Sequence, residues 1–325
     1  KWASERMLPS GLFWQHDVKD GMEESISGGR RVQNVRPTIN SYMVANARAI
    51  AKIADLAGRD DVSREFSGKA AALRNAMIDA LWDEQAAFFK VRLENGHLSD
   101  ARELIGYLPW MFDLAEPQHA AAWRQIRDRD GFLAAWGLTT AERRHPEFRS
   151  HGTGTCEWDG AVWPFATSQT LTAMACFLRG PEQQELTRRD YFDQVLTYAR
   201  SHQKNGQAYI GEYLDEVTGK WLITGPKAQR SRYYNHSTLN DHVIGGLAGI
   251  VPRADNVVDV DPLIPTEDAW DWFCLDGVPY HGHSLAIVWD KTGQRYGRGA
   301  GLSVWADGRE IARSDRLQRV WGELP

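Results

Sequence analysis

Acidic side chains gather in residues 9–35, where their types and spacing could support acid–base chemistry. Four carboxylates fall within eight positions of this segment: Asp17, Asp20, Glu23 and Glu24. The simplest interpretation of this cluster is a solvated acidic loop without catalytic function. Alternatively, Trp14 could form an aromatic wall that desolvates one carboxylic acid, which would raise its pKa and suit it to donate a proton.

Two tryptophans in residues 151–165 could form a platform for a sugar. Trp158 and Trp163 lie five positions apart, on a turn that leads into a predicted helix, with Asp159 between them. The pair could equally be core packing. In a carbohydrate site, the aromatic faces would cover the apolar C–H face of a pyranose, while the Asp159 carboxylate would accept hydrogen bonds from its hydroxyls.

A second acidic segment lies far along the chain, in residues 205–238. Glu212 stands between Gly211 and Tyr213 in this segment. By itself, one glutamate in a loop predicts nothing. Together with the acids of residues 9–35, it provides the two carboxylates that a glycosidase needs on either side of the scissile bond, one as acid and one as base or nucleophile.

Helices must position these segments, because apolar residues recur with helical period from about residue 36 to 250. We predict helices between Pro37 and Gly58, from Asp60 or Asp61 as N-cap to Leu81, and over 103–115, 117–128, 165–178, 186–202 and 237–250. Between them lie three loops that are long for a compact domain, 9–35, 131–164 and 205–236. Long loops are usually functional, and since these occupy alternate connections we expect them to meet on one rim of an all-α architecture.

A β domain is predicted after the helices. Beyond Pro252 the apolar period changes to two, as in Leu285, Ile287 and Trp289 and again in Leu302, Val304 and Ala306. Turn signals follow both runs, at 290–293 and at 307–308. We therefore predict a helical domain over residues 1–252 and a small β domain over residues 253–325.

Composition excludes several classes of function. The 325 residues carry 38 Lys+Arg and 43 Asp+Glu, and the resulting net charge of −5 does not favour a nucleic-acid partner or a basic membrane-binding surface. No apolar run reaches the roughly 18–20 residues that span a bilayer. Fourteen tryptophans are the unusual feature, and several of them fall in the long acidic loops.

The cysteines and the first residue say little about compartment. Cys156, Cys176 and Cys274 are odd in number and lack CxxC spacing, which predicts buried free thiols and neither a disulfide framework nor a zinc site. The chain begins at Lys1 without an apolar leader, so we expect a processed or excised piece. The sequence therefore leaves the compartment open.

Four motifs, taken in chain order, resemble those of one enzyme group. Gly21–Ser25 is similar to a Gly–apolar–Asp–x–Ser/Tyr motif, Trp158–Pro164 to a Trp-x-Gly-Pro-x-Trp-Pro motif, and Glu212–Gly219 to a Glu-x-Tyr-Asp…Thr-Gly motif. Tyr234–Ser237 is similar to the aromatic-x-x-Ser segment at the start of the last barrel helix. Over residues 9–250 the set resembles the (α/α)6-barrel glycoside hydrolases related to mannosylglycerate hydrolase, trehalase and the processing α-glucosidases of glycoside hydrolase family 63.

The resemblance implies roles for individual residues. Glu23 occupies the position of the general acid, where the group has Asp, and Asp20 is the alternative acid. Glu212 occupies the position of the base, which activates a water for inversion at the anomeric carbon. The implied substrate-binding residues are Trp14, Asp17, Arg36, Trp158, Asp159, Trp163, Tyr234 and His236. No cofactor and no metal ion are implied.

The resemblance also implies a fold and an activity. The fold is an all-α (α/α)6 toroid followed by a small β-sandwich-like domain. We count about seven or eight helices from the apolar period, fewer than the toroid has, so we expect it to be incomplete in this chain and completed by a missing N-terminal segment or another chain. The expected activity is exo-acting, inverting hydrolysis of an O-glycosidic bond in an oligosaccharide or small glycoside.

Three other functions compete with this hypothesis. A glycoside phosphorylase on the same barrel would use inorganic phosphate in place of the activated water and would need no base, which the presence of Glu212 disfavours. A non-catalytic carbohydrate-binding fragment would have carboxylates that do not face each other across a pocket. A metal hydrolase would need ligands, and the close pair His281 and His283 is more simply explained by a turn in the β part.

Overall fold

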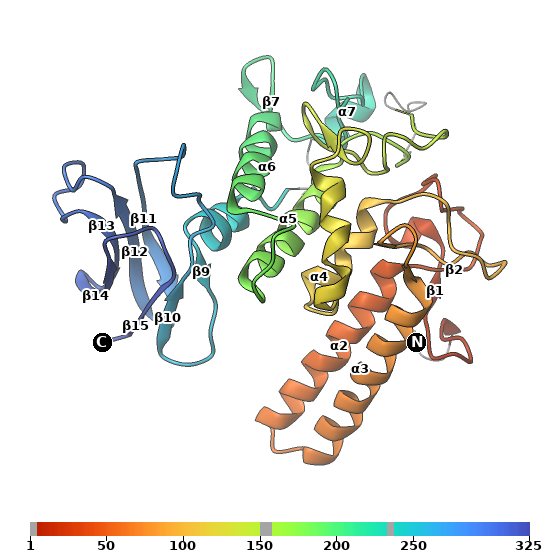
Figure 1. The fold of residues 1–325 in the computed structure, drawn as a ribbon, viewed down its shortest axis with the longest axis horizontal. Helices are drawn as coiled ribbons and strands as arrows, with labels where there is room; N and C mark the ends of the chain where they lie inside the picture. Colours follow the sequence, from red (N-terminus) through yellow and green to blue (C-terminus); the bar gives the residue numbers. More distant parts are fainter. Residues whose placement is uncertain (1–4, 150–157, 233–236) are drawn as a thin grey trace. The chain divides into compact units, whose positions relative to one another are not determined.

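The computed structural model describes residues 5–149, 158–232 and 237–325 (Figure 1). Packing divides the chain into two compact units, Lys1–Glu185 with Thr197–Ser237, and Leu186–Leu196 with Thr238–Pro325. The first unit is helical and the second is built mainly of β-sheet, so the predicted succession of helical and β regions is confirmed. The predicted boundary at residue 252 stays a prediction.

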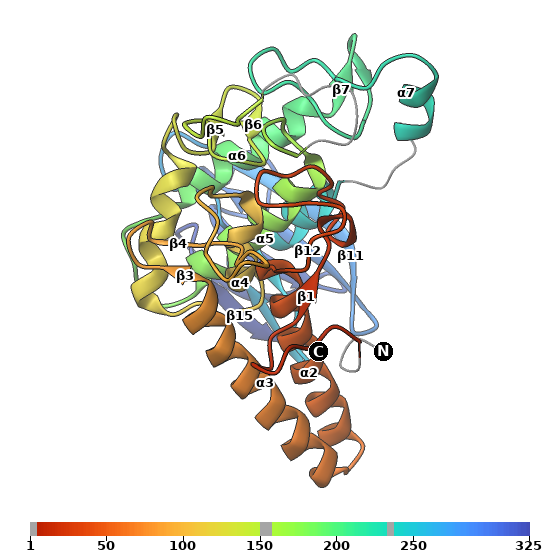
Figure 2. The same cartoon turned by 90° about the vertical axis from the view of Figure 1, so that its right-hand side faces the viewer.

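A long antiparallel hairpin of two helices opens the first unit, α2 (Pro37–Leu56) and α3 (Asp60–Leu81) (Figures 1 and 2). Pro37 begins α2 because its fixed φ and missing N–H suit the first helical turn. Small and branched side chains close the interface, with Val44, Ala47, Ala51 and Ala54 of α2 and Ala70, Leu73, Met77 and Leu81 of α3 all buried. Asp60 lies in the first turn of α3 and Arg59 is the cap, one residue from the predicted N-cap.

An aromatic core lies among the short helical segments predicted over 103–115 and 117–128, which the structure confirms as mainly 3-10 turns. This region forms two 3-10 segments, η2 (Leu104–Tyr107) and η3 (Pro117–Ile126), with the single α-helical turn α4 (Leu108–Met111) between them. Tyr107 and Trp123 stack with their centroids 4.4 Å apart, and Trp123 stacks in turn on Phe177 at 5.4 Å. Aromatic pairs of this kind add about 0.5–1.5 kcal/mol each beyond the burial of their area, so they contribute to the stability of this core.

The remaining elements of the first unit flank this core. Helix α5 (Pro164–Arg179) packs against α4, and α6 (Arg188–Ser201) follows it. Short hairpins carry the loops: β1 (Trp14–Gln15) with β2 (Asn34–Val35), β3 (Trp82–Asp83) with β4 (Phe88–Phe89), β5 (Leu133–Ala134) with β6 (Gly137–Leu138), and β7 (Gln203–Lys204) with β8 (Gln207–Ala208), before the short α7 (Pro226–Ser231). In the described part of the chain, no helix combines the length and apolarity needed to cross a membrane.

The second unit contains two antiparallel sheets. After α8 (Leu239–Asp241) and the π-helical η4 (His242–Leu247), the strands β9 (Ile250–Val251), β10 (Val257–Val260) and β15 (Val320–Glu323) form one sheet in the order β15-β10-β9. The strands β11 (Trp272–Tyr280), β12 (His283–Asp290), β13 (Gly301–Ala306) and β14 (Arg309–Ser314) form the other in sequence order. The predicted alternation is confirmed, since Leu285, Ile287, Leu302 and Val304 are all buried.

The first half of α6 packs with the β unit. The Arg188 guanidinium pairs with the Asp261 carboxylate at 2.8 Å, and the Phe192 ring lies edge-on to Trp270 with centroids 5.2 Å apart. The division between the two units therefore falls inside one continuous helix.

The cysteines differ from their prediction. Cys176 and Cys274 are free thiols, as expected, but both residues are exposed rather than buried. Cys176 lies near the end of α5 and Cys274 lies on β11, and each lines a cavity of its unit. Cys156 lies outside the described residues.

Gly106 tests the aromatic core. A Cβ at this position would overlap the Phe88 ring and the Phe89 carbonyl oxygen, whereas one at Gly68 on α3 would meet no atom within 4 Å. We expect Gly106→Ala to destabilise the protein by about 1–3 kcal/mol through overpacking, seen as a lower melting temperature. Gly68→Ala should raise that temperature or leave it unchanged, because alanine is the better helix former. Equal effects of the two changes would contradict this account.

Candidate active site

The loop of residues 9–35 meets the tryptophans of the next predicted segment. The Trp158 indole N–H donates a hydrogen bond to a Glu23 carboxylate oxygen at 3.3 Å. Gly21 approaches Trp163 so closely that a Cβ there would lie 3.2 Å from the indole ring, and its φ of +74° also favours glycine. Two segments more than 130 residues apart in sequence are therefore held together by the Trp158 side chain.

Trp158 also meets the segment that carries Glu212. Its ring stacks on Trp163 with centroids 4.3 Å apart and is met edge-on by Tyr213 at 5.3 Å. Val162 and Leu214 join the same two segments by a pair of backbone hydrogen bonds of 3.0 Å. Glu212 directly precedes Tyr213, and its side chain is 6% exposed. The structure thus brings all three predicted loops together.

The turn after Glu212 is closed by an aspartate. One Asp215 carboxylate oxygen accepts hydrogen bonds from the backbone N–H groups of Val217 and Thr218, at 3.0 and 2.6 Å, and from the Thr218 hydroxyl at 2.9 Å. An aspartate that bonds to the backbone two and three residues ahead of it stabilises a turn. This turn supports the segment, and Trp221 beside it is buried with Val162 and Leu214.

Asp20 and Arg36 form a buried ion pair beneath the loop. Their side chains are 1% and 0% exposed, and the Arg36 Nε donates to an Asp20 carboxylate oxygen. The Thr38 hydroxyl donates to the other oxygen at 2.6 Å, and the Gln15 amide contacts it as well. Burial raises the pKa of Asp20 above its usual value, although Arg36 and Thr38 act in the opposite direction.

Sequence reasoning missed Glu103, a third carboxylate in this buried group. Glu103 is 3% exposed and accepts hydrogen bonds from the Ser27 backbone N–H at 3.3 Å and from the Ser27 hydroxyl. Burial raises its pKa, while Arg36 and Ser27 act to lower it. The available signal was a single acid at the head of an otherwise apolar run, Leu104–Trp110. Glu103 anchors the far end of the loop.

Asp17 organises the loop from within. One of its oxygens accepts from the backbone N–H groups of Glu24 and Gly29, at 3.1 and 2.6 Å. The residue is 1% exposed, and its second oxygen is buried without a hydrogen bond among the described residues. The loop that presents Glu23 is therefore tied down at Asp17, Asp20 and Ser27.

The other predicted binding residues lie in different environments. Trp14 is half-buried and contacts His16, with the Arg6 guanidinium 4.2 Å above its ring. Asp159 is 3% exposed and forms an ion pair with Arg149. Tyr234 and His236 lie outside the described residues.

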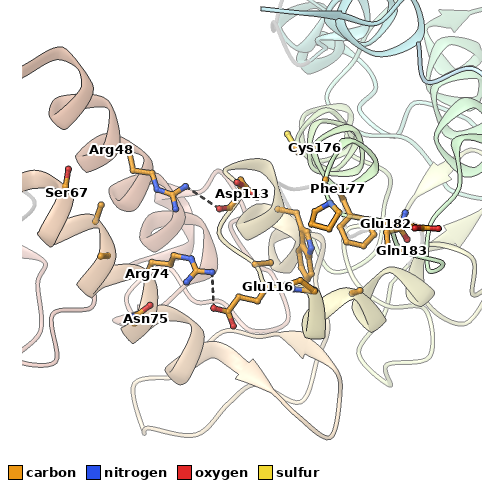
Figure 3. A pocket seen from close by; sticks show the side chains of 18 residues that line it. Arg48, Ser67, Arg74, Asn75, Asp113, Glu116, Cys176, Phe177, Glu182 and Gln183 are labelled. Atoms are coloured by element: carbon orange, nitrogen blue, oxygen red, sulfur yellow. Dashed lines mark hydrogen bonds and ion pairs between the residues drawn. The ribbon is translucent and has the colours of Figure 1, made fainter. Parts of the chain in front are cut away.

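Cavity size does not identify the site. A cavity of about 680 Å³ lies among α2, α3, α4, η3 and α5, where Arg48 contacts the Asp113 carbonyl and Arg74 pairs with Glu116 (Figure 3). None of the predicted site residues lines it. A smaller cavity of about 380 Å³ opens beside the acid loop, with Glu24 and Ser25 on one wall and Arg149 and Asp159 on the other. Because chemistry needs the carboxylates, we place the site at the loops. Among the described residues, no cluster of three His, Cys, Asp or Glu side chains could hold a metal ion.

The helical unit holds the Glu23 carboxylate and Tyr213, the neighbour of Glu212, against Trp158, and a β-sheet unit follows it. The model of the mannosylglycerate hydrolase MGH1-like glycoside hydrolase domain matches residues 1–237, and that of the C-terminal domain of glycosyl hydrolase family 65 matches residues 253–313. The chain belongs to the MGH1-like glycoside hydrolase domain family.

Three solved structures are similar to this chain. A protein named sialidase is 49% identical, with a TM-score of 0.95 over 99% of this chain and 30% of its own. A GH78 family rhamnosidase of Bacillus sp. GL1 shares the fold, at 14% identity and a TM-score of 0.57 over 89% of this chain and 27% of its own. The GH63 mannosylglycerate hydrolase from Thermus thermophilus is 20% identical, with a TM-score of 0.46 over 62% of this chain and 45% of its own. The chain spans less than a third of the first two.

Glu103 gives a pH test of the buried group. Because its pKa is raised, the folded protein keeps this proton to a higher pH than the unfolded chain, and stability falls as the pH rises through the interval between the two pKa values. Each pKa unit of difference is worth about 1.4 kcal/mol. We expect Glu103→Gln to gain stability relative to the wild type as the pH is raised from about 4 to about 7, the interval above the ordinary pKa of a glutamate. Melting temperatures at each pH measure this, and a constant difference would contradict it.

Proposed function

We propose that the chain carries the catalytic centre of an exo-acting, anomer-inverting O-glycosyl hydrolase, with Glu23 as general acid and Glu212 as base. The observation that carries the proposal is the shared contact with Trp158, which binds Glu23 through its indole N–H and Tyr213, the neighbour of Glu212, through its ring. The Trp158 side chain would thereby hold the loops of two carboxylates in one place, as hydrolysis at an anomeric carbon requires. In a single displacement, water would attack the anomeric carbon and lose a proton to Glu212, while the glycosidic C–O bond breaks and Glu23 protonates the leaving oxygen.

Burial favours Glu23 over Asp20 as the acid. A general acid must reach the leaving oxygen within hydrogen-bond distance. The Asp20 side chain is 1% exposed and engaged by Arg36 and Thr38, whereas Glu23 is partly exposed and sits at the tryptophan platform. We propose that Asp20 positions the loop.

The remaining residues divide into two proposed groups. Asp17 and Arg36 are buried under the loop and would position it, so their contribution to sugar binding would be indirect. Trp14, which is half-buried, would contact the sugar together with Tyr234 and His236, whereas Trp158, Asp159 and Trp163 are 1%, 3% and 5% exposed and would position the groups around it. The ion pair of Asp159 with Arg149 would hold its carboxylate beside the tryptophans.

The proposed fold and substrate follow from family membership. We propose that the helices are the C-terminal part of an (α/α)6 toroid, completed by another segment or chain, and that the β unit is a sandwich-like accessory domain. The substrate would be an oligosaccharide or small glycoside. The relative named sialidase does not select the sugar, because this chain covers 30% of it, so sialosides belong in the screen beside gluco- and manno-configured glycosides and β-L-arabinofuranosides.

Removing the base should abolish turnover. In the full-length protein, we expect Glu212→Gln and Glu23→Gln each to lower kcat on a cognate aryl glycoside by about 10²–10⁴-fold, as loss of acid–base catalysis does. The matched control is Glu24→Gln, next to the acid but exposed and paired with Arg30, which should leave kcat near the wild-type value. Near-normal turnover by Glu212→Gln would contradict the assignment of Glu212 as the base. Turnover that depends on phosphate would indicate a phosphorylase.

The anomer of the product tests the mechanism. An inverting enzyme holds its carboxyl groups roughly 6.5–9.5 Å apart to admit the water, whereas a retaining one needs about 5 Å. We expect the sugar first released to have the opposite anomeric configuration to the substrate. ¹H NMR during the first minutes of the reaction reports this directly, and a product of retained configuration would overturn the proposed role of Glu212.

A further inference from the structure

The outer face of the four-stranded sheet carries a cavity far in sequence from the proposed catalytic residues. Its volume is about 430 Å³, within the range of small-molecule sites. Strands β11, β12 and β13 form its floor, and the loop of residues 291–300 forms one wall. Ten residues line it: Cys274, Asp276, Ser284, Ala286, Val288, Tyr296, Arg298, Trp305, Asp307 and Gly308.

Small side chains make the cavity floor. Cys274 is paired with Val288, and Ala286 with Trp305, so that these side chains share one face of the sheet. The opposite face carries the buried Leu285, Ile287 and Val304 of the core. A sheet face with small residues in its middle and a tryptophan beside them leaves room for a flat ligand.

A β-bulge presents a carboxylate at the cavity. The register of β11 and β12 shifts between Leu275 and Val278, and Gly277 at the bulge has φ +70°. Bulges change the direction of a side chain and are common beside binding sites. One Asp276 oxygen accepts from the Gly277 N–H at 2.8 Å, and the other makes no hydrogen bond among the described residues.

Arg298 is held over the same cavity without a carboxylate partner among the described residues. Its guanidinium lies 4.1 Å from the centroid of the Trp305 ring. In that part of the chain it forms no hydrogen bond or ion pair through this group, so its N–H donors are available to a ligand. Asp276, Arg298 and Cys274 all line the same cavity.

The loop that carries Arg298 is rigidly attached. The Asp290 carboxylate accepts from the backbone N–H groups of Gly293, Arg295 and Tyr296, at 2.8, 2.7 and 3.0 Å. The loop is therefore closed around a buried aspartate, and the Tyr296 ring stays at the cavity. Asp307 on the other side is engaged by the His283 ring at 2.7 Å and by the Ser284 N–H at 2.9 Å.

We propose that this cavity, formed by Asp276, Ser284, Tyr296, Arg298 and Trp305, is a second binding site for a neutral saccharide. The Arg298 guanidinium could donate hydrogen bonds to one hydroxyl oxygen of a sugar. The Asp276 carboxylate could accept a hydrogen bond from a neighbouring hydroxyl group of the same sugar. Tyr296 and Trp305 supply apolar ring surface for C–H groups. Two carboxylates, Asp276 and Asp307, line the cavity against the one guanidinium of Arg298, which disfavours an acidic ligand and leaves a neutral one. The site would bind a polysaccharide chain while hydrolysis occurs elsewhere.

The test is native affinity electrophoresis of the full-length protein in gels that contain a neutral polysaccharide, with galactomannan, xyloglucan, arabinan and, for comparison, the acidic polygalacturonate as probes. We expect retardation by at least one neutral polymer. Arg298→Gln and Trp305→Ala should each reduce the association constant at least tenfold, while leaving kcat on a small aryl glycoside unchanged. Titration calorimetry with the matching oligosaccharide measures the same loss.

A matched control and two further measurements keep the outcomes distinct. Trp321→Ala removes a tryptophan from β15 that is 67% exposed and does not line the cavity, and it should not change retardation. Melting temperatures establish that Trp305→Ala is folded, and Arg298→Gln, at an exposed side chain, provides the second variant. Retardation by none of the neutral polymers, by polygalacturonate alone, or to the same extent after Arg298→Gln would overturn the proposal. Glu212→Gln should keep full retardation even if the catalytic hypothesis fails.

Discussion

The organisation of the candidate site depends on one side chain, the Trp158 indole. A buried N–H must find an acceptor, and here it is the Glu23 carboxylate of a distant loop. The ring faces of Trp158 and Trp163 cover each other, and the edge-on contact with Tyr213 brings in the third loop. A single aromatic residue thus satisfies one polar contact and two apolar ones, and each contact fixes a different segment of the chain.

The buried charges beneath the loop carry a cost that the rest of the structure must offset. Arg36 pairs with Asp20, and the charges of Glu103 and Asp17 also act on its guanidinium, with all four side chains out of contact with water. Desolvation of such groups is expensive, and removal of one partner is usually more damaging than replacement of the whole set. The pKa values of Asp20 and Glu103 are raised for this reason, because desolvation favours the neutral carboxyl group over the carboxylate. What the group provides is a fixed position for the loop that carries Glu23.

Structural features that depend on neighbouring residues in the chain could be predicted from the sequence, whereas those that depend on distant partners could not. The hairpin α2–α3 and the strands β12 and β13 follow from apolar periodicity, and the meeting of three loops from their motifs. The short helical segments predicted over 103–115 and 117–128 are confirmed, but periodicity did not reveal that they are mainly 3-10 turns around stacked rings such as Tyr107 and Trp123. Glu103 could not be found, since its partner Ser27 is 76 positions away. Arg36 was predicted to bind the sugar, but residue type alone does not reveal its buried ion pair with Asp20.

Helix α6 has a consequence for how such a protein could have been assembled. Residues 186–196 pack with the β unit through Arg188 and Phe192, whereas the chain from 197 to 237 returns to the helical unit before the β strands begin. A single crossover after residue 237 would therefore not transfer the whole β unit, because residues 186–196 lie before that point. Exchange at residue 252 would separate the strands from part of their own core.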